Sequence, residues 1–174
     1  LLARRAEGRL AVTFDGPVTF LNGGLFPHLH RPVRIQKLLA GPAGPLLARM
    51  MTERRYVQGL RGVLAAPVDE RELREHWRAF SRDGGHRNVH ALLDYIAQRR
   101  ANEDRWVGAL VDCDLPRRFV WGPLDPVSGA HVLPEIERRI PDAQVHVLDG
   151  VGHYPQLEAT ARVAAALSAR PAVE

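Results

Sequence analysis

The sequence predicts an α/β fold in which a block of helices interrupts a parallel β-sheet. After Pro116, short apolar segments alternate with stretches of helical periodicity, and short connectors join them. This alternation is typical of parallel α/β units. One more strand-like segment lies near the start of the chain, and the long stretch between it and Pro116 has helical patterning only. We therefore expect an incomplete parallel sheet with an inserted helical region.

The composition limits the classes of protein that the chain can be. Its 174 residues are 45% hydrophobic and 25% charged, close to the average for globular domains, which argues against disorder. No apolar run approaches the ~18 residues of a membrane-spanning helix, so no transmembrane segment is expected. Cys113 is the only cysteine, which excludes an internal disulfide and favours a reducing compartment, the cytoplasm.

The basic residues do not form a nucleic-acid footprint, although the net charge is +4. Lys37 is the only lysine, and the arginines are spread along the chain. Pairs such as Arg54–Arg55 and Arg138–Arg139 fall on expected helices or beside acidic residues, where they are typical of solvated faces. We therefore expect no nucleic-acid partner.

The first 24 residues predict the end of a helix and one core strand. Residues 1–9 resemble the last turns of a helix that stops at a glycine, with neither an initiator Met nor a signal peptide before them. Residues 18–21 form a strand candidate, closed by the turn sequence Asn22-Gly23-Gly24. We interpret the chain as the carboxyl-terminal part of a longer protein.

Residues 25–112 are expected to be helical. Proline starts, glycine stops and capping signals divide this region into segments. The expected helices run from Pro32 to Leu39, from Pro45 past Met51, from Asp69 through Phe80, from a cap at Asn88 through Ile96, and from Asn102 through Val111.

Residues 113–174 return to the sheet. Residues 118–121 are a short apolar strand that ends in Gly-Pro-Leu-Asp-Pro, and a helix follows near 131–140. Residues 144–148 form the next strand, before the sequence Asp-Gly-Val-Gly-His and a last amphipathic helix through Leu167. The expected order is therefore strand, helix, strand, helix.

Two residues lie where parallel sheets place their functional sites, just past the carboxyl ends of strands. Asp125 follows the strand that ends at Trp121, and His153 follows the strand that ends at Leu148. Asp125 alone is typical of a turn. An acid and a histidine that follow neighbouring strands could lie side by side, and the histidine base of a nucleophilic triad requires such an acid. The joint occurrence predicts that Asp125 orients His153 as a general base.

The segments around these residues resemble motifs of the α/β-hydrolase superfamily. Residues 122–126 are similar to its acid motif, and residues 152–158 to its histidine motif. The sequences Leu-Asn-Gly-Gly-Leu-Phe-Pro at 21–27 and Arg-Trp-Val-Gly-Ala-Leu at 105–110 resemble the branch of mesoderm-specific transcript protein, near epoxide hydrolases and haloalkane dehalogenases. The resemblance implies that residues 25–112 form a cap, and that the reaction is hydrolysis of a small apolar epoxide, ester or halide.

One departure from the family pattern concerns the nucleophile. The chain contains no Gly-x-Ser-x-Gly elbow, and the family places its nucleophile before the helix that we expect to end near Leu1. The resemblance therefore implies an upstream nucleophile, Asp or Ser, and a fragment that is inactive alone. A non-catalytic scaffold that keeps the hydrolase fold is the alternative.

Other polar residues have positions or spacings that could serve binding. In the epoxide-hydrolase-like branch a cap tyrosine contacts substrate, and Tyr95 is the candidate here, although a half-buried packing role is the plainer interpretation. The pairs His28/His30 and His86/His90 have spacings that a metal could use, but no carboxylate accompanies them at ligand spacing. We expect no metal and no cofactor.

The absent upstream strands should also leave apolar surface uncovered. We expect the strand at 18–21 to have an unpaired edge, and Val18, Phe20, Phe119 and Val120 to lack covering helices on one side.

Overall fold

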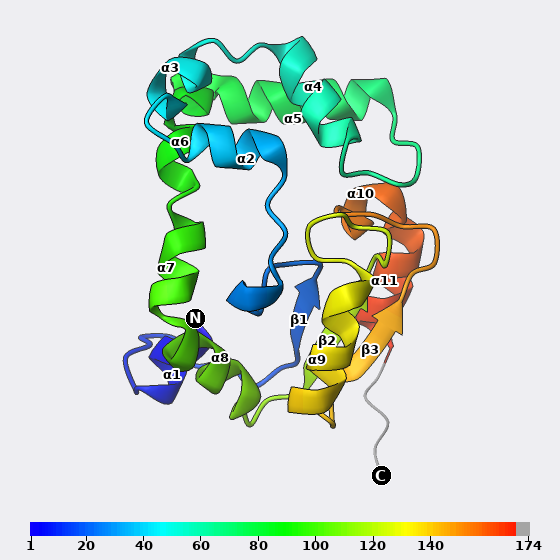
Figure 1. The fold of residues 1–174 in the computed structure, drawn as a ribbon. Helices are drawn as coiled ribbons and strands as arrows, with labels where there is room; N and C mark the ends of the chain where they lie inside the picture. Colours follow the sequence, from blue (N-terminus) through cyan, green and yellow to red (C-terminus); the bar gives the residue numbers. More distant parts are fainter. Residues whose placement is uncertain (170–174) are drawn as a thin grey trace.

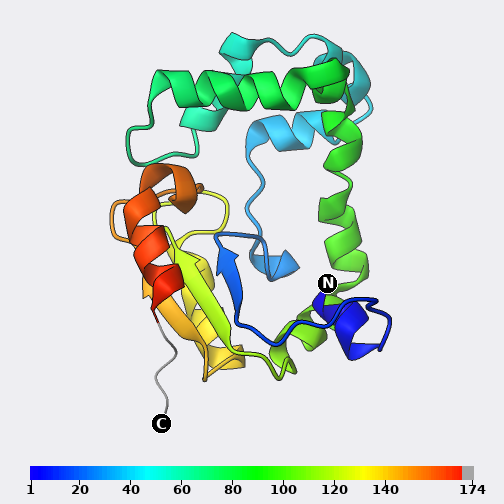
Figure 2. The same cartoon turned by 180° about the vertical axis from the view of Figure 1, so that it is seen from behind.

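The computed structural model describes residues 1–169, and it contains a three-stranded parallel sheet with a block of helices above it (Figures 1 and 2). The strands are β1 (Val18–Leu21), β2 (Arg117–Trp121) and β3 (Gln144–Val147), in the order β1-β2-β3. Phe20 pairs with Phe119, and Phe119 with Val145, so the carboxyl ends of the strands meet at one edge of the sheet. The expected α/β class and parallel sheet are confirmed.

Helices occupy most of the remaining chain. The α-helices are α1 (Leu2–Ala6), α2 (Arg34–Leu39), α3 (Gly44–Arg49), α4 (Glu53–Arg61), α5 (Glu70–Ser81), α6 (Val89–Leu92), α7 (Tyr95–Ala101), α8 (Glu103–Val111), α9 (Leu133–Arg139), α10 (Pro155–Glu158) and α11 (Thr160–Ser168). Short 3-10 helices lie at Pro27–Leu29, Arg82–Asn88 and Ala130–Val132. The last five residues of the chain, at the end of the expected 113–174 region, lie outside the described residues.

Capping chemistry explains where the structure follows the expected helix boundaries and where it departs from them. The Asp69 carboxylate accepts a hydrogen bond from the Arg71 amide at 2.7 Å, and α5 begins directly after it. The expected cap at Asn88 is wrong, because Asn88 has φ −94° and ψ 2° instead of an extended backbone, and its side chain makes no capping bond. The helix expected there is two helices, α6 and α7, and α4 was not expected at all.

Helices cover both faces of β2 (Figures 1 and 2). On one face Phe119 and Trp121 pack with Ile136 of α9, and on the other Val120 packs with Val163 of α11. Phe119 and Val120 are 0% exposed, so the expectation that they lack cover is wrong: α9 and α11 supply it from within this chain. Only β1 is half-buried along its whole length.

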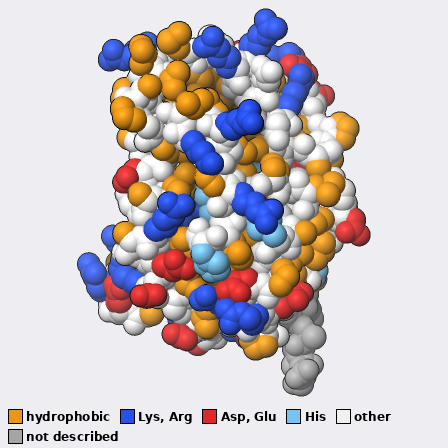
Figure 3. Space-filling model, in the orientation of Figure 1, with side chains coloured by type: hydrophobic (Ala, Val, Ile, Leu, Met, Phe, Trp, Pro, Cys, Tyr) orange, Lys and Arg blue, Asp and Glu red, His pale blue; other side chains and the backbone are white. Residues whose placement is uncertain are grey.

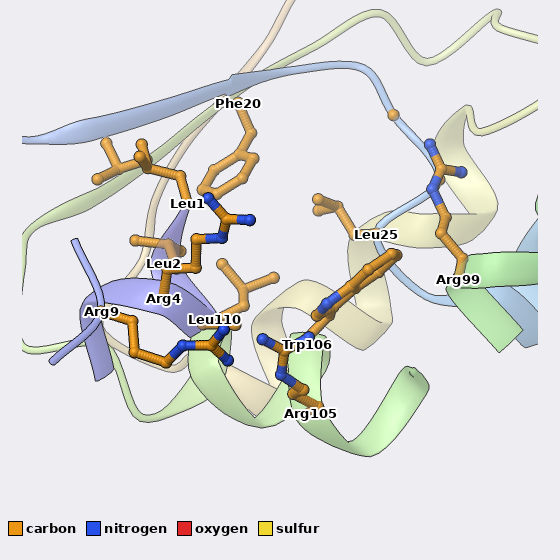
Figure 4. A pocket seen from close by; sticks show the side chains of 14 residues that line it. Leu1, Leu2, Arg4, Arg9, Phe20, Leu25, Arg99, Arg105, Trp106 and Leu110 are labelled. Carbon is orange, nitrogen blue, oxygen red and sulfur yellow. The ribbon is translucent and has the colours of Figure 1, made fainter. Parts of the chain in front are cut away.

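The outer side of β1 faces a large cavity of about 850 Å³ (Figure 4). Val18 and Phe20 of β1 line it together with Leu2 of α1 and Trp106 of α8. Among residues 1–169, β1 pairs with β2 and with no strand on its other edge. The expected unpaired apolar edge is therefore present at β1.

The helical segment, residues 25–112, rises from the end of β1 and returns to the sheet through α7 and α8. In Figure 1, α4 and α5 lie across the top, and the loop between them descends toward α10. Within the part of the chain that the structure describes, no helix is long and apolar enough to cross a bilayer.

Candidate active site

The two residues singled out after the strands lie in direct contact. His153 follows β3, Asp125 follows β2, and His153 Nδ1 lies 2.8 Å from Asp125 Oδ2. The Asp125 side chain is 0% exposed and that of His153 is 23% exposed. The neighbouring positions of β2 and β3 thus bring together an inaccessible acid and an accessible imidazole.

Hydrogen bonds stabilise Asp125 as a carboxylate. Its Oδ2 accepts bonds from Asn22 Nδ2 at 3.0 Å and Ser128 Oγ at 2.7 Å, and its Oδ1 accepts from the Val127 amide at 2.7 Å. Burial pushes the pKa of Asp125 upward, but the hydrogen bond and charge of His153, with those from Ser128 and Val127, outweigh it and hold the pKa at about 2. Asp125 is therefore ionised at neutral pH, with its charge directed at His153 Nδ1.

Asn22 is a site residue that the sequence indicated only as part of a turn. Its Oδ1 accepts a hydrogen bond from the Gly122 amide at 2.6 Å, while its Nδ2 donates to the Gly122 carbonyl and to Asp125. The side chain thus joins the end of β1 to the turn after β2. Its position just past a parallel strand, the same signal that identified Asp125, was available in the sequence.

The contact with Asp125 decides which nitrogen of His153 can react. A carboxylate accepts only hydrogen bonds, so Nδ1 carries a proton and Nε2 is left with the lone pair of the neutral ring. The ring also lies edge-to-face against Tyr154, with 4.8 Å between centroids. This arrangement suits a general base whose Nε2 takes a proton and whose imidazolium is stabilised by Asp125.

The loop that carries His153 is attached to the loop between α4 and α5. Glu158 Oε2 accepts hydrogen bonds from the amides of Ala65, Ala66 and Gly152 at 2.7, 2.9 and 2.8 Å. A side chain at Gly152 would lie 2.6 Å from the Val63 carbonyl oxygen, so only glycine permits this approach. One carboxylate therefore fixes the helical segment to the histidine loop.

A cavity of about 570 Å³ separates the helical segment from His153. Its lining is mostly apolar, and it includes Leu39, Met51, Tyr56, Leu60 and Leu93 besides His153 and Tyr154. Ile35 and Met50 also line it and are 46% and 52% exposed, which places an apolar rim at the surface. Figure 3 shows hydrophobic side chains gathered over this part of the helical segment. The arrangement suits an apolar small molecule.

Tyr95 lies outside that lining. It begins α7, its ring packs against the cluster of Leu39 and Leu93, and the Arg99 guanidinium lies over the ring at 4.5 Å from the centroid. Its expected contact with substrate stays a prediction.

Three of the four histidines with metal-like spacing contact other protein groups. His28 Nδ1 is 3.2 Å from Glu103 Oε1, His90 Nδ1 is 2.9 Å from the Arg87 carbonyl oxygen, and His86 packs against Trp77. Over residues 1–169, no group of three or more His, Cys, Asp or Glu side chains is placed to hold a metal ion.

The sequence is similar to curated proteins over most of its length. The human mesoderm-specific transcript homolog protein is 40% identical over 158 residues, which cover 87% of this chain and 46% of that protein. LipZ of Mycobacterium tuberculosis, whose name calls it a hydrolase, is 37% identical over 167 residues, covering 91% of this chain and 56% of LipZ. The chain spans about half the length of these curated relatives. No protein-family model matches it.

Solved structures agree on the fold. An α/β-hydrolase fold protein from Burkholderia ambifaria matches with a TM-score of 0.69 and 19% identity, covering 97% of this chain and 60% of that one. The 2-hydroxy-6-oxo-6-phenylhexa-2,4-dienoate hydrolase of a Rhodococcus species matches with a TM-score of 0.63 and 18% identity, covering 88% of this chain and 54% of that one. At these identities the likeness is one of fold.

Proposed function

Because the chain belongs to the α/β-hydrolase superfamily, we propose that it supplies the acid, the histidine base and the cap of a hydrolase. Asp125 is the acid, His153 is the base, and residues 25–112 are the cap. The observation that carries the proposal is the 2.8 Å contact between His153 Nδ1 and the buried, ionised Asp125, with Nε2 left free beside an apolar cavity.

The chemistry follows from the side of the histidine that remains free. With a serine nucleophile upstream of Leu1, His153 Nε2 would remove the hydroxyl proton as the oxygen attacks the substrate, and would then protonate the leaving group. With an aspartate nucleophile, attack would form a covalent ester, and His153 would activate the water that hydrolyses it. In both cases Asp125 stabilises the imidazolium formed when His153 takes up the proton.

The cavity favours a small apolar substrate, such as an epoxide, an ester or an organic halide. Leu39, Met51 and Leu60 offer it apolar contact area, and His153 lines the same cavity, to which Arg55 adds one charged side chain. Under this proposal the binding partner is a small molecule and not a nucleic acid, and the reaction uses no metal or cofactor. The presence of one cysteine suits a protein of the reducing cytoplasm.

The experiment is His153→Ala in the complete protein, assayed against ester, epoxide and haloalkane panels. We expect multiple turnover to disappear, and with an aspartate nucleophile the covalent ester should accumulate and add the mass of the bound group. His76→Ala, on α5 away from the cavity lining, is the matched control. Turnover that survives in His153→Ala would refute the role of His153 as the base. A complete wild-type protein that has Gly or Ala at the nucleophile position and shows no turnover would favour the non-catalytic scaffold.

A further inference from the structure

Hydrogen bonds hold the backbone at the proposed base and on either side of it. The Gly152 amide donates to Glu158 Oε2 at 2.8 Å, and the Tyr154 amide donates to Oε1 of the same side chain at 3.0 Å. Between them, the His153 amide donates to the Val63 carbonyl oxygen at 3.0 Å. Val63 lies in the loop between α4 and α5. The main chain at His153 is therefore fixed by one carboxylate and by one carbonyl group of the helical segment.

The same carboxylate holds the loop that supplies this carbonyl group. Glu158 Oε2 also accepts hydrogen bonds from the amides of Ala65 and Ala66. Hydrogen bonds to an ionised acceptor are stronger than those between neutral groups, and here they join two loops that are far apart in the sequence. We name residues 63–66, residues 152–154 and Glu158 together the Glu158 clamp. Every donor and acceptor of the clamp belongs to the described chain.

Close packing leaves the histidine loop little room to move. A β-carbon at Gly152 would lie 2.6 Å from the Val63 carbonyl oxygen and 2.7 Å from the Ala65 nitrogen. On the other side, a β-carbon at Gly122, in the turn after β2, would overlap the Gly152 carbonyl oxygen. The histidine loop therefore lies between the backbone of the sheet and the backbone of the α4–α5 loop, and two glycines allow this approach.

An apolar contact connects the same two parts of the chain. The side chain of Tyr154, directly after His153, packs against Val57 and Leu60 of α4 and Leu73 of α5. Figure 1 shows the α4–α5 loop descending toward α10, the helix that begins just after Tyr154. The residue after the histidine is thus part of the helical segment's own core.

We propose that Glu158 is a positioning residue for the general base, and that it acts by fixing the α4–α5 loop to the backbone around His153. The inference rests on the proposed hydrolase function and deepens it: the helical segment holds the histidine in place as well as covering the cavity. Glu158 does not line that cavity, so it would not touch substrate. Proton transfer requires His153 to face Asp125 and the nucleophile at once, and a displacement of about 1 Å can lower the rate about 100-fold.

The first test measures turnover by the complete protein. Glu158→Gln keeps the size of the side chain, but its single acceptor oxygen can face either the α4–α5 loop amides or the Tyr154 amide. We expect kcat to fall ~10- to 100-fold and KM to stay nearly constant, because only the reacting geometry changes. Two controls should keep the wild-type kcat: Glu137→Gln removes an exposed charge, and Ile136→Val removes a buried methyl group from α9. An unchanged kcat in Glu158→Gln would overturn the proposal.

A second variant disturbs the clamp from its other side. Gly152→Ala keeps Glu158 but places a methyl group where the Val63 carbonyl oxygen lies, so it should also lower kcat. If both positions act through one clamp, the double variant should lose little more kcat than the more damaged single variant. Losses that multiply would show that the two positions act separately, and they would contradict a single clamp.

A measurement without turnover keeps this inference distinct from the proposed function. Nitrogen chemical shifts of the neutral His153 ring report its tautomer, and the contact with Asp125 places the proton on Nδ1 in the wild-type protein. Glu158→Gln and Gly152→Ala should show a mixture of tautomers, whereas Ile136→Val should keep the wild-type form. This pattern in a complete protein that hydrolyses no substrate refutes the hydrolase and keeps the positioning role. A wild-type tautomer in Glu158→Gln refutes the positioning role whatever the hydrolytic activity.

Discussion

Replacing Asp125 by Asn removes the buried charge on which the site depends while keeping the shape of the side chain. In the wild-type structure Oδ2 accepts from His153, Asn22 and Ser128, and Oδ1 accepts from the Val127 amide. An asparagine amide carries two hydrogens on one of these positions, so either orientation directs donors at donors. We expect Asp125→Asn to lower kcat by about 10⁴, as loss of the triad acid does where the histidine is left in the wrong tautomer.

The contribution of Asp125 to stability can be worked out from its pKa. The folded protein lowers that pKa from an ordinary 3.8 to about 2, and each unit is worth about 1.4 kcal/mol, so ionised Asp125 stabilises the fold by about 2–3 kcal/mol. Because the folded pKa is the lower one, this stabilisation is fully present above about pH 4 and is lost as the pH falls through 2.

The assay is urea denaturation followed by circular dichroism between pH 5 and pH 2. The free energy of unfolding should fall by about 2 kcal/mol more in the wild-type protein than in Asp125→Asn. Other carboxylates with a low pKa, such as Glu135, titrate in both proteins and cancel in the difference. Asp149→Asn, at an exposed position after β3, should retain the wild-type pH dependence. An equal loss in the wild-type protein and Asp125→Asn would refute the electrostatic account.

Two further predictions concern side chains that join separate loops. Asn22→Ala leaves the Gly122 amide without its acceptor, so it should lower the free energy of unfolding by about 1–3 kcal/mol and lower kcat more than it changes KM. Asn102→Ala, which removes an exposed helical bond, should do neither, and an Asn22→Ala protein of normal stability and kcat would contradict this role of Asn22. Glu158→Gln should lower the hydrogen-exchange protection of the Ala65 and Ala66 amides at least tenfold, because its single acceptor oxygen can face either these amides or the Tyr154 amide, which bonds the other oxygen of Glu158. The exposed Glu137→Gln should not change this protection, and unchanged protection in Glu158→Gln would show that other contacts hold the loop.

The sequence predicted best what depends on neighbours in the chain. The three strands begin and end within a residue of their expected limits, because short apolar runs bounded by Pro, Gly and Asp leave little choice. The meeting of Asp125 and His153 followed from topology, since adjacent parallel strands end at the same edge. Expected helices failed where a local signal was ambiguous, as at Asn88, whose backbone continues a 3-10 turn instead of starting a cap.

The sequence could not show which distant groups the polar side chains of the site bind. The position of Asn22 just past a strand marks it as a candidate, but its two following glycines are typical of a turn, and no residue near it shows that its amide reaches Asp125, 103 residues away. Glu158 likewise looks like part of the histidine motif, yet its carboxylate also binds amides 92 and 93 positions earlier. The partners of Asn22 and Glu158 are brought to them by the order of the strands and by the descent of the α4–α5 loop, and neither is written in the residues that surround them in the chain.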